Sequence, residues 1–199
     1  TDSELGVNCQ GADYIQNFDS PYVLPWEVGK TFVIGQVNCT DGSHSRDSYA
    51  QFAYDIPMPI GTNLVAVQSG IVVGLAENFE DVQDGVNDIS LYDKANYINI
   101  EHLDGTRASY GHLTLNGVLK SIGDNVNQGE VIALSGNSGW SSEPHLHFQL
   151  NKCIDTDDRP NYTQTVCNSV SITFKNTSEH CFGLLGSNFK PNGYTAEPY

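Results

Sequence analysis

The sequence predicts an all-β, single-domain protein, built on an antiparallel sheet with few short helices. Residues 49–56, 64–67 and 71–73 are rich in β-branched and aromatic residues and are separated by glycines, which is typical of short strands joined by bends. Residues 97–103 alternate with the period of a strand. The 199 residues suffice for one core, and 19 Gly, 10 Tyr and 17% charged residues are typical of strands and turns.

The hairpin is the clearest local prediction, because Asp104-Gly105 is a strong turn signal and residues 106–113 should return antiparallel to residues 97–103. Residues 77–88 are polar and predict a surface loop. The remaining predicted elements are strands at residues 130–134 and 143–148, a loop at residues 136–139, and a last apolar run at residues 170–174.

The expected domain has three parts. Residues 1–43 contain Pro21 and Pro25 and should form an extended N-terminal arm packed on the core. Residues 44–152 should form the core itself, and residues 153–199 a C-terminal extension of the same domain that is tied by a disulfide.

The five cysteines show neither a CxxC pair nor the spacing of a zinc finger, so disulfides are the better interpretation. We expect Cys9 to pair with Cys39 and Cys153 with Cys167, although Cys167 with Cys181 competes with the second pair. One thiol is then left over.

Charge and hydropathy exclude two classes of partner. Nine Lys plus Arg against 24 Asp plus Glu give a formal charge of -15, which should repel nucleic acid and anionic membranes. No apolar run approaches the roughly 20 residues of a membrane helix. Thr1 opens a polar segment, so we expect a secreted or periplasmic protein, processed from a precursor and monomeric.

The residues with the strongest chemical signal lie in Glu143-Pro144-His145-Leu146-His147-Phe148. Side chains at i and i+2 of a strand share a face, so both histidines can point into one cleft. Asp55 is a carboxylate inside an apolar run and needs a partner. Catalytic zinc takes three such ligands and keeps a position for water.

A structural role is the alternative for each histidine considered alone. A lone strand histidine, such as His102 or His112, is more often a hydrogen-bonded structural residue than a catalyst. The pairing of His145 with His147 favours a metal site over packing, whereas His102 and His180 stay outside the predicted site.

The order of several short motifs resembles the lysostaphin-like zinc endopeptidases of bacterial cell walls, which include the LytM and beta-lytic branches. The resemblance spans roughly residues 22–150. Its motifs are Ala53-Tyr54-Asp55-Ile56-Pro57-Met58-Pro59-Ile60-Gly61-Thr62, Val65-Ala66 with Gly70-Ile71-Val72, Ile98-Asn99-Ile100-Glu101-His102, Tyr110-Gly111-His112-Leu113, Gly123-Asp124 with Gly129-Glu130, and Pro144-His145-Leu146-His147-Phe148.

The resemblance implies a duplicated-hybrid-motif architecture with an open groove and one Zn²⁺ ion. It implies that Asp55 and His147 ligate the metal, while His112 and His145 are catalytic and steady the attacking water and the oxyanion. The first histidine ligand of the lysostaphin-type pattern is replaced by Gln51, a poor zinc ligand. We favour His44 instead, because the beta-lytic branch also uses a histidine more than ten residues upstream; the alternative is a site with two ligands.

The function implied is a secreted zinc metalloendopeptidase that hydrolyses the peptide cross-bridges of bacterial peptidoglycan. Two alternatives stay open. A non-catalytic relative that binds the wall or regulates a hydrolase is suggested by Gln51. A secreted protease that acts on glycine-rich proteins such as elastin is suggested by the beta-lytic resemblance.

Overall fold

The computed structural model describes residues 14–15, 17–40, 42–45, 48–155, 165–177 and 193–199, and their secondary structure is almost entirely β. The 3-10 helices in these ranges are η1 (Asn17–Asp19), η2 (Gly42–His44) and η3 (Ile89–Leu91). The strands are β1 (Thr31–Phe32), β2 (Tyr54–Pro57), β3 (Asn63–Val65), β4 (Gly70–Ala76), β5 (Asn96–His102), β6 (Thr106–Val118), β7 (Asn125–Val126), β8 (Val131–Ser135), β9 (His145–Asp155), β10 (Thr165–Val170) and β11 (Tyr194–Thr195).

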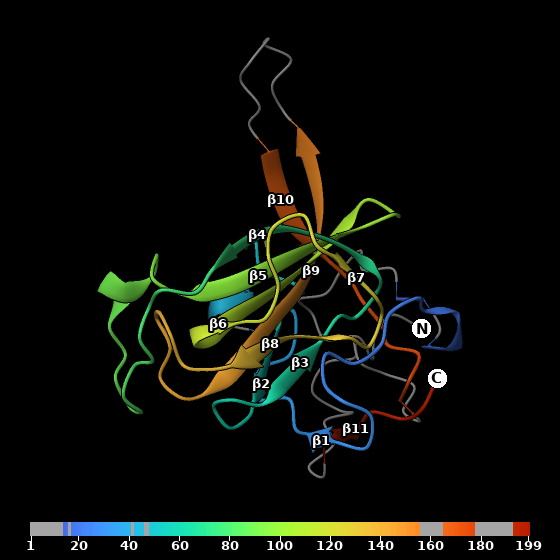
Figure 1. The fold of residues 1–199 in the computed structure, drawn as a ribbon. Helices are drawn as coiled ribbons and strands as arrows, with labels where there is room; N and C mark the ends of the chain where they lie inside the picture. Colours follow the sequence, from blue (N-terminus) through green and yellow to red (C-terminus); the bar gives the residue numbers. More distant parts are fainter. Residues whose placement is uncertain (1–13, 16, 41, 46–47, 156–164, 178–192) are drawn as a thin grey trace.

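Nine of the strands in the described ranges form one antiparallel sheet (Figure 1). Its main path is β10-β9-β6-β5-β4-β7, while β2 pairs with β9 and β8 pairs with β3 and β6. The remaining two strands, β1 and β11, pair with each other. The prediction of an all-β, antiparallel fold is therefore confirmed, as is the hairpin, in which Ile100 of β5 lies opposite Ala108 of β6.

Three strand predictions are wrong in part. The strand predicted at residues 64–67 ends at Val65. Residues 48–53 are not extended, because backbone N–H groups bond to the carbonyl three residues earlier, as Gln51 does to Ser48 and Ala53 to Ala50. In the last apolar run only Val170 belongs to a strand. Ile172 and Phe174 are nevertheless buried in the core, so their apolar character reflects packing rather than strand pairing.

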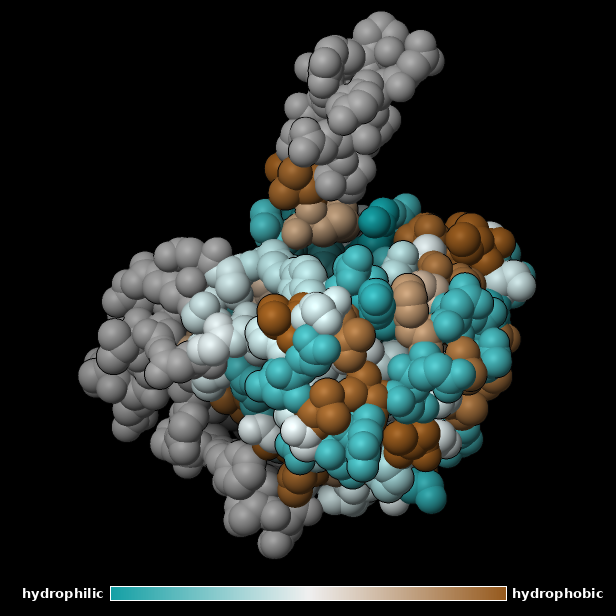
Figure 2. All heavy atoms as spheres, turned by 90° about the vertical axis from the view of Figure 1, so that its left-hand side faces the viewer, coloured by the Kyte–Doolittle hydropathy of each residue, from teal (hydrophilic) through white to brown (hydrophobic). Residues whose placement is uncertain are grey.

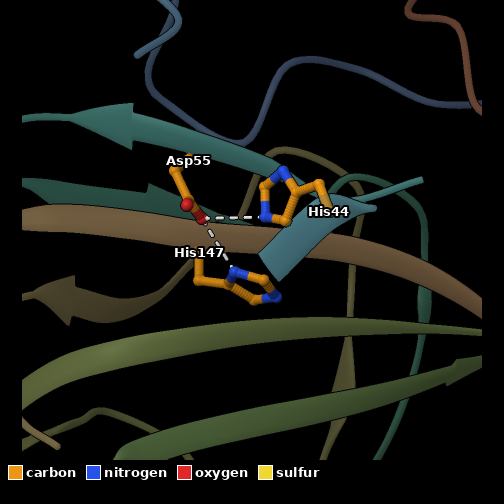
Figure 3. A group of neighbouring side chains, drawn as sticks. All are labelled: His44, Asp55 and His147. Carbon is orange, nitrogen blue, oxygen red and sulfur yellow. Dashed lines mark hydrogen bonds and ion pairs between the residues drawn. The ribbon is translucent and has the colours of Figure 1, made fainter. Parts of the chain in front are cut away.

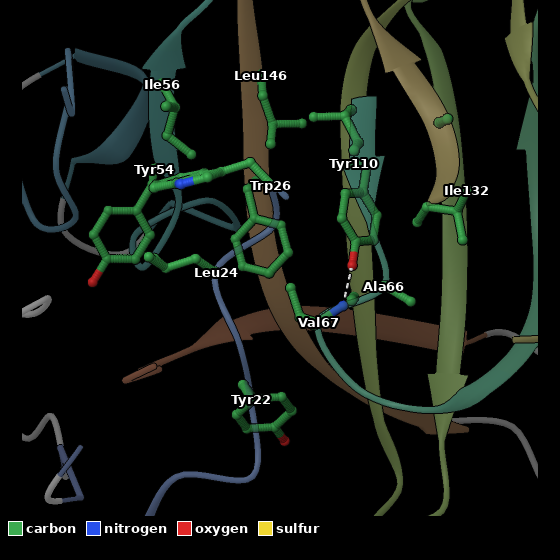
Figure 4. Close-up of a cluster of buried hydrophobic side chains, with 14 of the residues drawn as sticks. Tyr22, Leu24, Trp26, Tyr54, Ile56, Ala66, Val67, Tyr110, Ile132 and Leu146 are labelled. Atoms are coloured by element: carbon green, nitrogen blue, oxygen red, sulfur yellow. Dashed lines mark hydrogen bonds between the residues drawn. The ribbon is translucent and has the colours of Figure 1, made fainter. Parts of the chain in front are cut away.

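The core lies against one face of the main sheet (Figure 4). Tyr110 of β6 and Phe148 of β9 are fully buried, with their rings 5.3 Å apart. Leu24 and Trp26, which precede the sheet in the chain, pack into the same cluster. Each such side chain contributes on the order of 1.5–3 kcal/mol by leaving water, so the N-terminal segment stabilises the sheet it covers.

Cys153 and Cys167 form a disulfide between directly paired positions of β9 and β10, which confirms that predicted pair. Cys39 is also disulfide-bonded. Cys9 and Cys181 both lie outside those residues, as does His180, so the predicted pairing of Cys9 with Cys39 stays a prediction.

On the face shown in Figure 2, hydrophobic residues form small patches set among hydrophilic ones. Single exposed apolar side chains of this kind are normal for a protein surface in water. Among the described residues, no helix has the length and apolar character needed to span a bilayer.

The Tyr110 hydroxyl accepts a hydrogen bond of 2.8 Å from the backbone N–H of Val67 (Figure 4). A substitution at Tyr110 therefore measures how much this buried hydrogen bond stabilises the fold. We expect Tyr110→Phe to lower the free energy of unfolding by about 1–3 kcal/mol, since a buried N–H loses its partner. Tyr97→Phe, at a partly exposed tyrosine of β5, is the control and should change it by less than about 0.5 kcal/mol. Urea denaturation measures both, and equal effects would contradict the expectation.

Candidate functional site

The pairing of β2 with β9 brings two of the predicted residues together. Asp55 lies directly opposite His147 in the antiparallel register, so their side chains leave the sheet on the same face. The Nδ1 atom of His147 is 2.7 Å from Oδ1 of Asp55. A carboxylate in an apolar strand thus has the partner that its burial requires.

His44 reaches the same carboxylate from a separate segment. It ends the short helix η2 and is fully buried. Its Nδ1 atom contacts the carbonyl oxygen of Val37 at 3.2 Å, and its Nε2 atom lies 3.4 Å from Oδ1 of Asp55. The neighbouring residue Gln36 forms a β-bridge with Asp55, so residues 36–37 position both side chains at once.

His44, Asp55 and His147 together form a cluster that could hold a metal ion (Figure 3). One nitrogen or oxygen atom from each lies within 4.8 Å of the others. The donor set of two imidazoles and a carboxylate suits zinc. His44 Nε2 is buried and has no hydrogen-bond partner among the described residues. When Nδ1 donates its proton to Val37, Nε2 presents a lone pair, and a cation between it and Asp55 would satisfy both.

The cluster shifts the pKa values of its members in opposite directions. Burial alone would raise the pKa of Asp55, but the neighbouring imidazoles, chiefly through the hydrogen bond from His147, hold it well below its usual value. Burial alone would lower the pKa of His147, but the hydrogen bond and negative charge of Asp55 raise it instead. Asp55 therefore stays ionised at neutral pH, which is the form that ligates a metal.

The two predicted catalytic histidines line a cleft of about 610 Å³ beside this cluster, together with Asp55 and His147. The rings of His112 and His145 are 4.5 Å apart. Nδ1 of His145 lies 2.8 Å from the carbonyl oxygen of Glu143 and 3.1 Å from the Ser141 hydroxyl. Its Nε2 atom is 3.8 Å from Oδ1 of Asp55, so this nitrogen faces the cluster.

His112 has an unusual backbone conformation for a strand residue. Its φ of 57° lies in the left-handed region, which non-glycine residues rarely adopt. Its Nδ1 atom donates to the carbonyl oxygen of Ser138 at 2.7 Å. Burial and the nearby rings of His145 and His147 lower the pKa of His112 to about 3, so its ring is neutral at pH 7. Strain of this kind persists where surrounding contacts enforce it, and it clusters at functional sites.

Asp81 fastens the loop that carries Ser138. One carboxylate oxygen accepts the backbone N–H of Asn137 at 2.6 Å, and the other accepts the hydroxyl of Thr114 at 2.5 Å. The hydroxyl of Ser138 also donates to the carbonyl of Leu113 at 2.6 Å. The carbonyl that holds His112 is therefore fixed on both sides, by the acidic loop after β4 and by β6.

Sequence reasoning missed the aromatic residues of the cleft. Tyr49, Tyr92 and Trp140 line it, and the two tyrosine hydroxyl groups are 3.4 Å apart. Each lies in a turn or loop, where neither period-two alternation nor a motif marks it. Burial and the neighbouring Tyr92 raise the pKa of Tyr49 to about 12, so it keeps its proton.

Gln51 and His102 lie outside the cluster. The amide nitrogen of Gln51 is 3.8 Å from the sulfur of Cys39. His102 is buried, and its Nδ1 atom contacts the carbonyl oxygen of Ser69 at 3.1 Å. The structure therefore brings together the three predicted ligands and both predicted catalytic histidines, and it gives His102 a structural setting.

An all-β sheet that carries a His-Asp-His cluster and two further histidines in an open cleft defines the class of candidate metallopeptidases. The chain belongs to peptidase family M23, whose model matches residues 50–162, more than half of the chain. The lysostaphin-like resemblance seen in the motifs is thus confirmed at the level of the family.

Three curated relatives are similar to this chain. An uncharacterized metalloprotease from Buchnera aphidicola subsp. Baizongia pistaciae is 34% identical over 130 residues, which are 65% of this chain and 30% of that protein. Lysostaphin from Staphylococcus simulans is 35% identical over 99 residues (49% and 17%). The peptidoglycan DD-endopeptidase ShyA from Vibrio cholerae is 33% identical over 96 residues (48% and 19%). The chain therefore spans less than a third of the length of each.

The support of His112 by the acidic loop predicts a local effect of Asp81→Ala. Hydrogen bonds to charged groups contribute about 1.5–3 kcal/mol, so we expect the amide of Asn137 to exchange with solvent at least about tenfold faster. Hydrogen exchange followed by NMR measures this. Asp84→Ala, at an exposed carboxylate of the same loop, is the control and should leave the rate unchanged. Unchanged exchange in Asp81→Ala would show that the loop is held by other contacts.

Proposed function

We propose that this chain is a secreted, monomeric zinc metalloendopeptidase that hydrolyses the peptide cross-bridges of bacterial peptidoglycan. One observation carries the proposal: a buried imidazole nitrogen of His44, which has no hydrogen-bond partner in the described part of the chain, faces Asp55 and His147 at the wall of an open cleft. Membership of peptidase family M23 gives the reaction class. We place the catalytic core at residues 44–152, with residues 1–43 and 153–199 as parts of the same domain.

His44, Asp55 and His147 are the proposed ligands of one zinc ion. Zinc bound there would supply Lewis acidity, which activates water and polarises the scissile carbonyl. Each of the three residues is already held by a second contact. His44 is held by Val37, His147 by Gln149, and the backbone of Asp55 by Gln36. Such outer contacts fix the ring orientation of ligating histidines.

His145 and His112 are the proposed catalytic residues. The contacts of Nδ1 in each ring leave Nε2 as the nitrogen that exchanges a proton with the reacting groups. His145 Nε2 faces the carboxylate of the cluster and suits the removal of a proton from attacking water. The neutral ring of His112 lies beside it. Because Nδ1 donates to Ser138, Nε2 of His112 carries a lone pair and suits the acceptance of a hydrogen bond or proton from the tetrahedral intermediate.

The proposed substrate rests on the shape of the cleft and on the relatives. A cleft that is open to solvent admits a chain from a polymer network, whereas an enclosed pocket would not. The similar protein ShyA is described as a peptidoglycan DD-endopeptidase. The formal charge of -15 disfavours polyanionic substrates and leaves peptide cross-bridges as the more suitable part of a cell wall.

Metal binding tests the ligand set. We expect the full chain purified with zinc to hold one ion, and His44→Ala to weaken its affinity by more than about 100-fold, beyond the effect of losing an outer-shell partner. Gln51→Ala is the matched control, because Gln51 occupies the position of the ligand in the lysostaphin-type pattern; it should retain zinc. Mass spectrometric metal analysis and competition with a chelator measure both. A native protein that binds no zinc would favour the wall-binding or regulatory alternative.

Hydrolysis of peptidoglycan tests the catalytic residues. We expect His112→Ala and His145→Ala each to lower turnover by on the order of 10²-fold or more, since each removes a group that acts in the transition state, while both proteins still bind zinc. Mass analysis of the products from defined muropeptides measures the rates, with His102→Gln as a control remote from the cleft. Near-normal rates in both alanine variants would contradict the proposed catalytic roles of the two histidines. Faster digestion of elastin than of peptidoglycan would show that a glycine-rich protein, and not peptidoglycan, is the preferred substrate.

A further inference from the structure

A row of polar side chains, two of them buried and two partly buried, continues from His147 across the outer face of the sheet. Gln149 and Asn151 follow His147 on β9 at i+2 and i+4 and therefore share its face. Ser109 of β6 pairs directly with Gln149, and Asn99 of β5 pairs directly with Ser109. We call Gln149, Asn151, Ser109 and Asn99 the amide row.

The amide row is connected by hydrogen bonds that all run in one direction. The Nε2 atom of His147 is 3.0 Å from Oε1 of Gln149. The amide nitrogen of Gln149 donates to Oδ1 of Asn151 at 2.6 Å, and the amide nitrogen of Asn151 donates to the Ser109 hydroxyl at 3.1 Å. That hydroxyl donates to Oδ1 of Asn99 at 2.6 Å. Donor and acceptor are opposite ends of each amide, so reversing one member opposes its neighbours.

Packing does not account for the amide row. Gln149 is 6% exposed and Asn151 is 3% exposed, so the outer face of β9 is buried here as the inner face is. The inner-face residues between them, Phe148 and Leu150, are apolar as expected of a covered strand. Burying two amides costs free energy unless every polar group is paired, and apolar residues would fill the space without that requirement.

The direction of the row decides which nitrogen of His147 carries a proton. Because Oε1 of Gln149 accepts, Nε2 of His147 must donate whether or not Nδ1 carries a proton, so Nδ1 is the nitrogen that can exchange its proton for a cation. Nδ1 is the atom that faces Asp55 within the cluster. In the opposite direction, the Gln149 amide would donate to Nε2 and leave the proton on Nδ1, where it would exclude a cation.

We propose that Gln149, oriented by the rest of the amide row, is a positioning residue that fixes the proton of His147 on Nε2 and thereby makes Nδ1 the metal-binding atom. This inference rests on the proposed function insofar as His147 binds a metal. It adds a row of groups that reaches Asn151, four residues beyond His147 on β9, and acts on the metal only through the imidazole.

The test uses the full chain loaded with zinc and labelled with 15N-histidine. In the native protein, NMR correlations of the His147 ring should show a proton on Nε2 and none on Nδ1. In Gln149→Leu the Nε2 proton should exchange with solvent faster, because it has lost its acceptor, and zinc should bind 10- to 100-fold more weakly in chelator competition, as outer-shell changes typically do. Gln149→Glu keeps an acceptor for Nε2 and should restore both the slow exchange and most of the affinity, which a role in packing alone does not predict.

Two further variants separate the outcomes. Asn151→Leu leaves the contact between Gln149 and His147 in place but removes the partner that orients Gln149. It should therefore speed the exchange of the His147 Nε2 proton to a smaller extent, and the inference stays testable if Gln149→Leu does not fold. Asn168→Leu makes the same change at an exposed position of β10 and should alter neither measurement. A proton on Nδ1 of native His147, or unchanged zinc affinity in Gln149→Leu, would overturn the inference. A protein with the expected ring pattern and zinc affinity that cleaves no peptidoglycan would overturn only the proposed function.

Discussion

The antiparallel register between β2 and β9 is the constraint on which the site depends. It sets Asp55 opposite His147 and Pro57 opposite His145, while the pairing of β9 with β6 sets Gly111 opposite His147. A slip of one residue would turn every side chain of β9 to the other face and bury the histidines among Tyr110 and the core. The positions of Asp55 and His147 in the cluster are therefore a consequence of strand pairing. Only His44 is positioned by a different element, the short helix η2.

Three imidazole nitrogens lie close to a single carboxylate oxygen at this site. Oδ1 of Asp55 lies 2.7, 3.4 and 3.8 Å from nitrogens of His147, His44 and His145. Removing a carboxylate from water is costly, and the hydrogen bond between Asp55 and His147 offsets part of that cost. The buried lone pair of His44 gains nothing from this arrangement unless a cation lies beside it. A metal ion that binds the folded chain and not the unfolded chain would therefore also stabilise the fold.

Much of this arrangement was predictable from the sequence, for reasons that the residues make clear. Alternation and a turn signal predicted the β5–β6 hairpin, and the i, i+2 spacing predicted that His145 and His147 would line one cleft. The turn at residues 48–53 and the aromatic wall were not predictable, because i to i−3 bonds and loop contacts leave no periodic signal. Gln149 did carry a signal, since a polar residue two positions after a ligand on a covered strand requires a partner.

The two faces of strand β9 have different roles, one in core packing and one in the site, because successive side chains alternate between the faces. Leu146, Phe148 and Leu150 are buried on the core side, and the odd-numbered residues from His145 to Asn151 are on the side of the site. The apolar contacts stabilise one register, and that register is the same one that aligns the cluster with the amide row. Loss of core packing at β9 should therefore disturb the orientation of His147 before any polar contact is removed, because the strand's position is what all those contacts share.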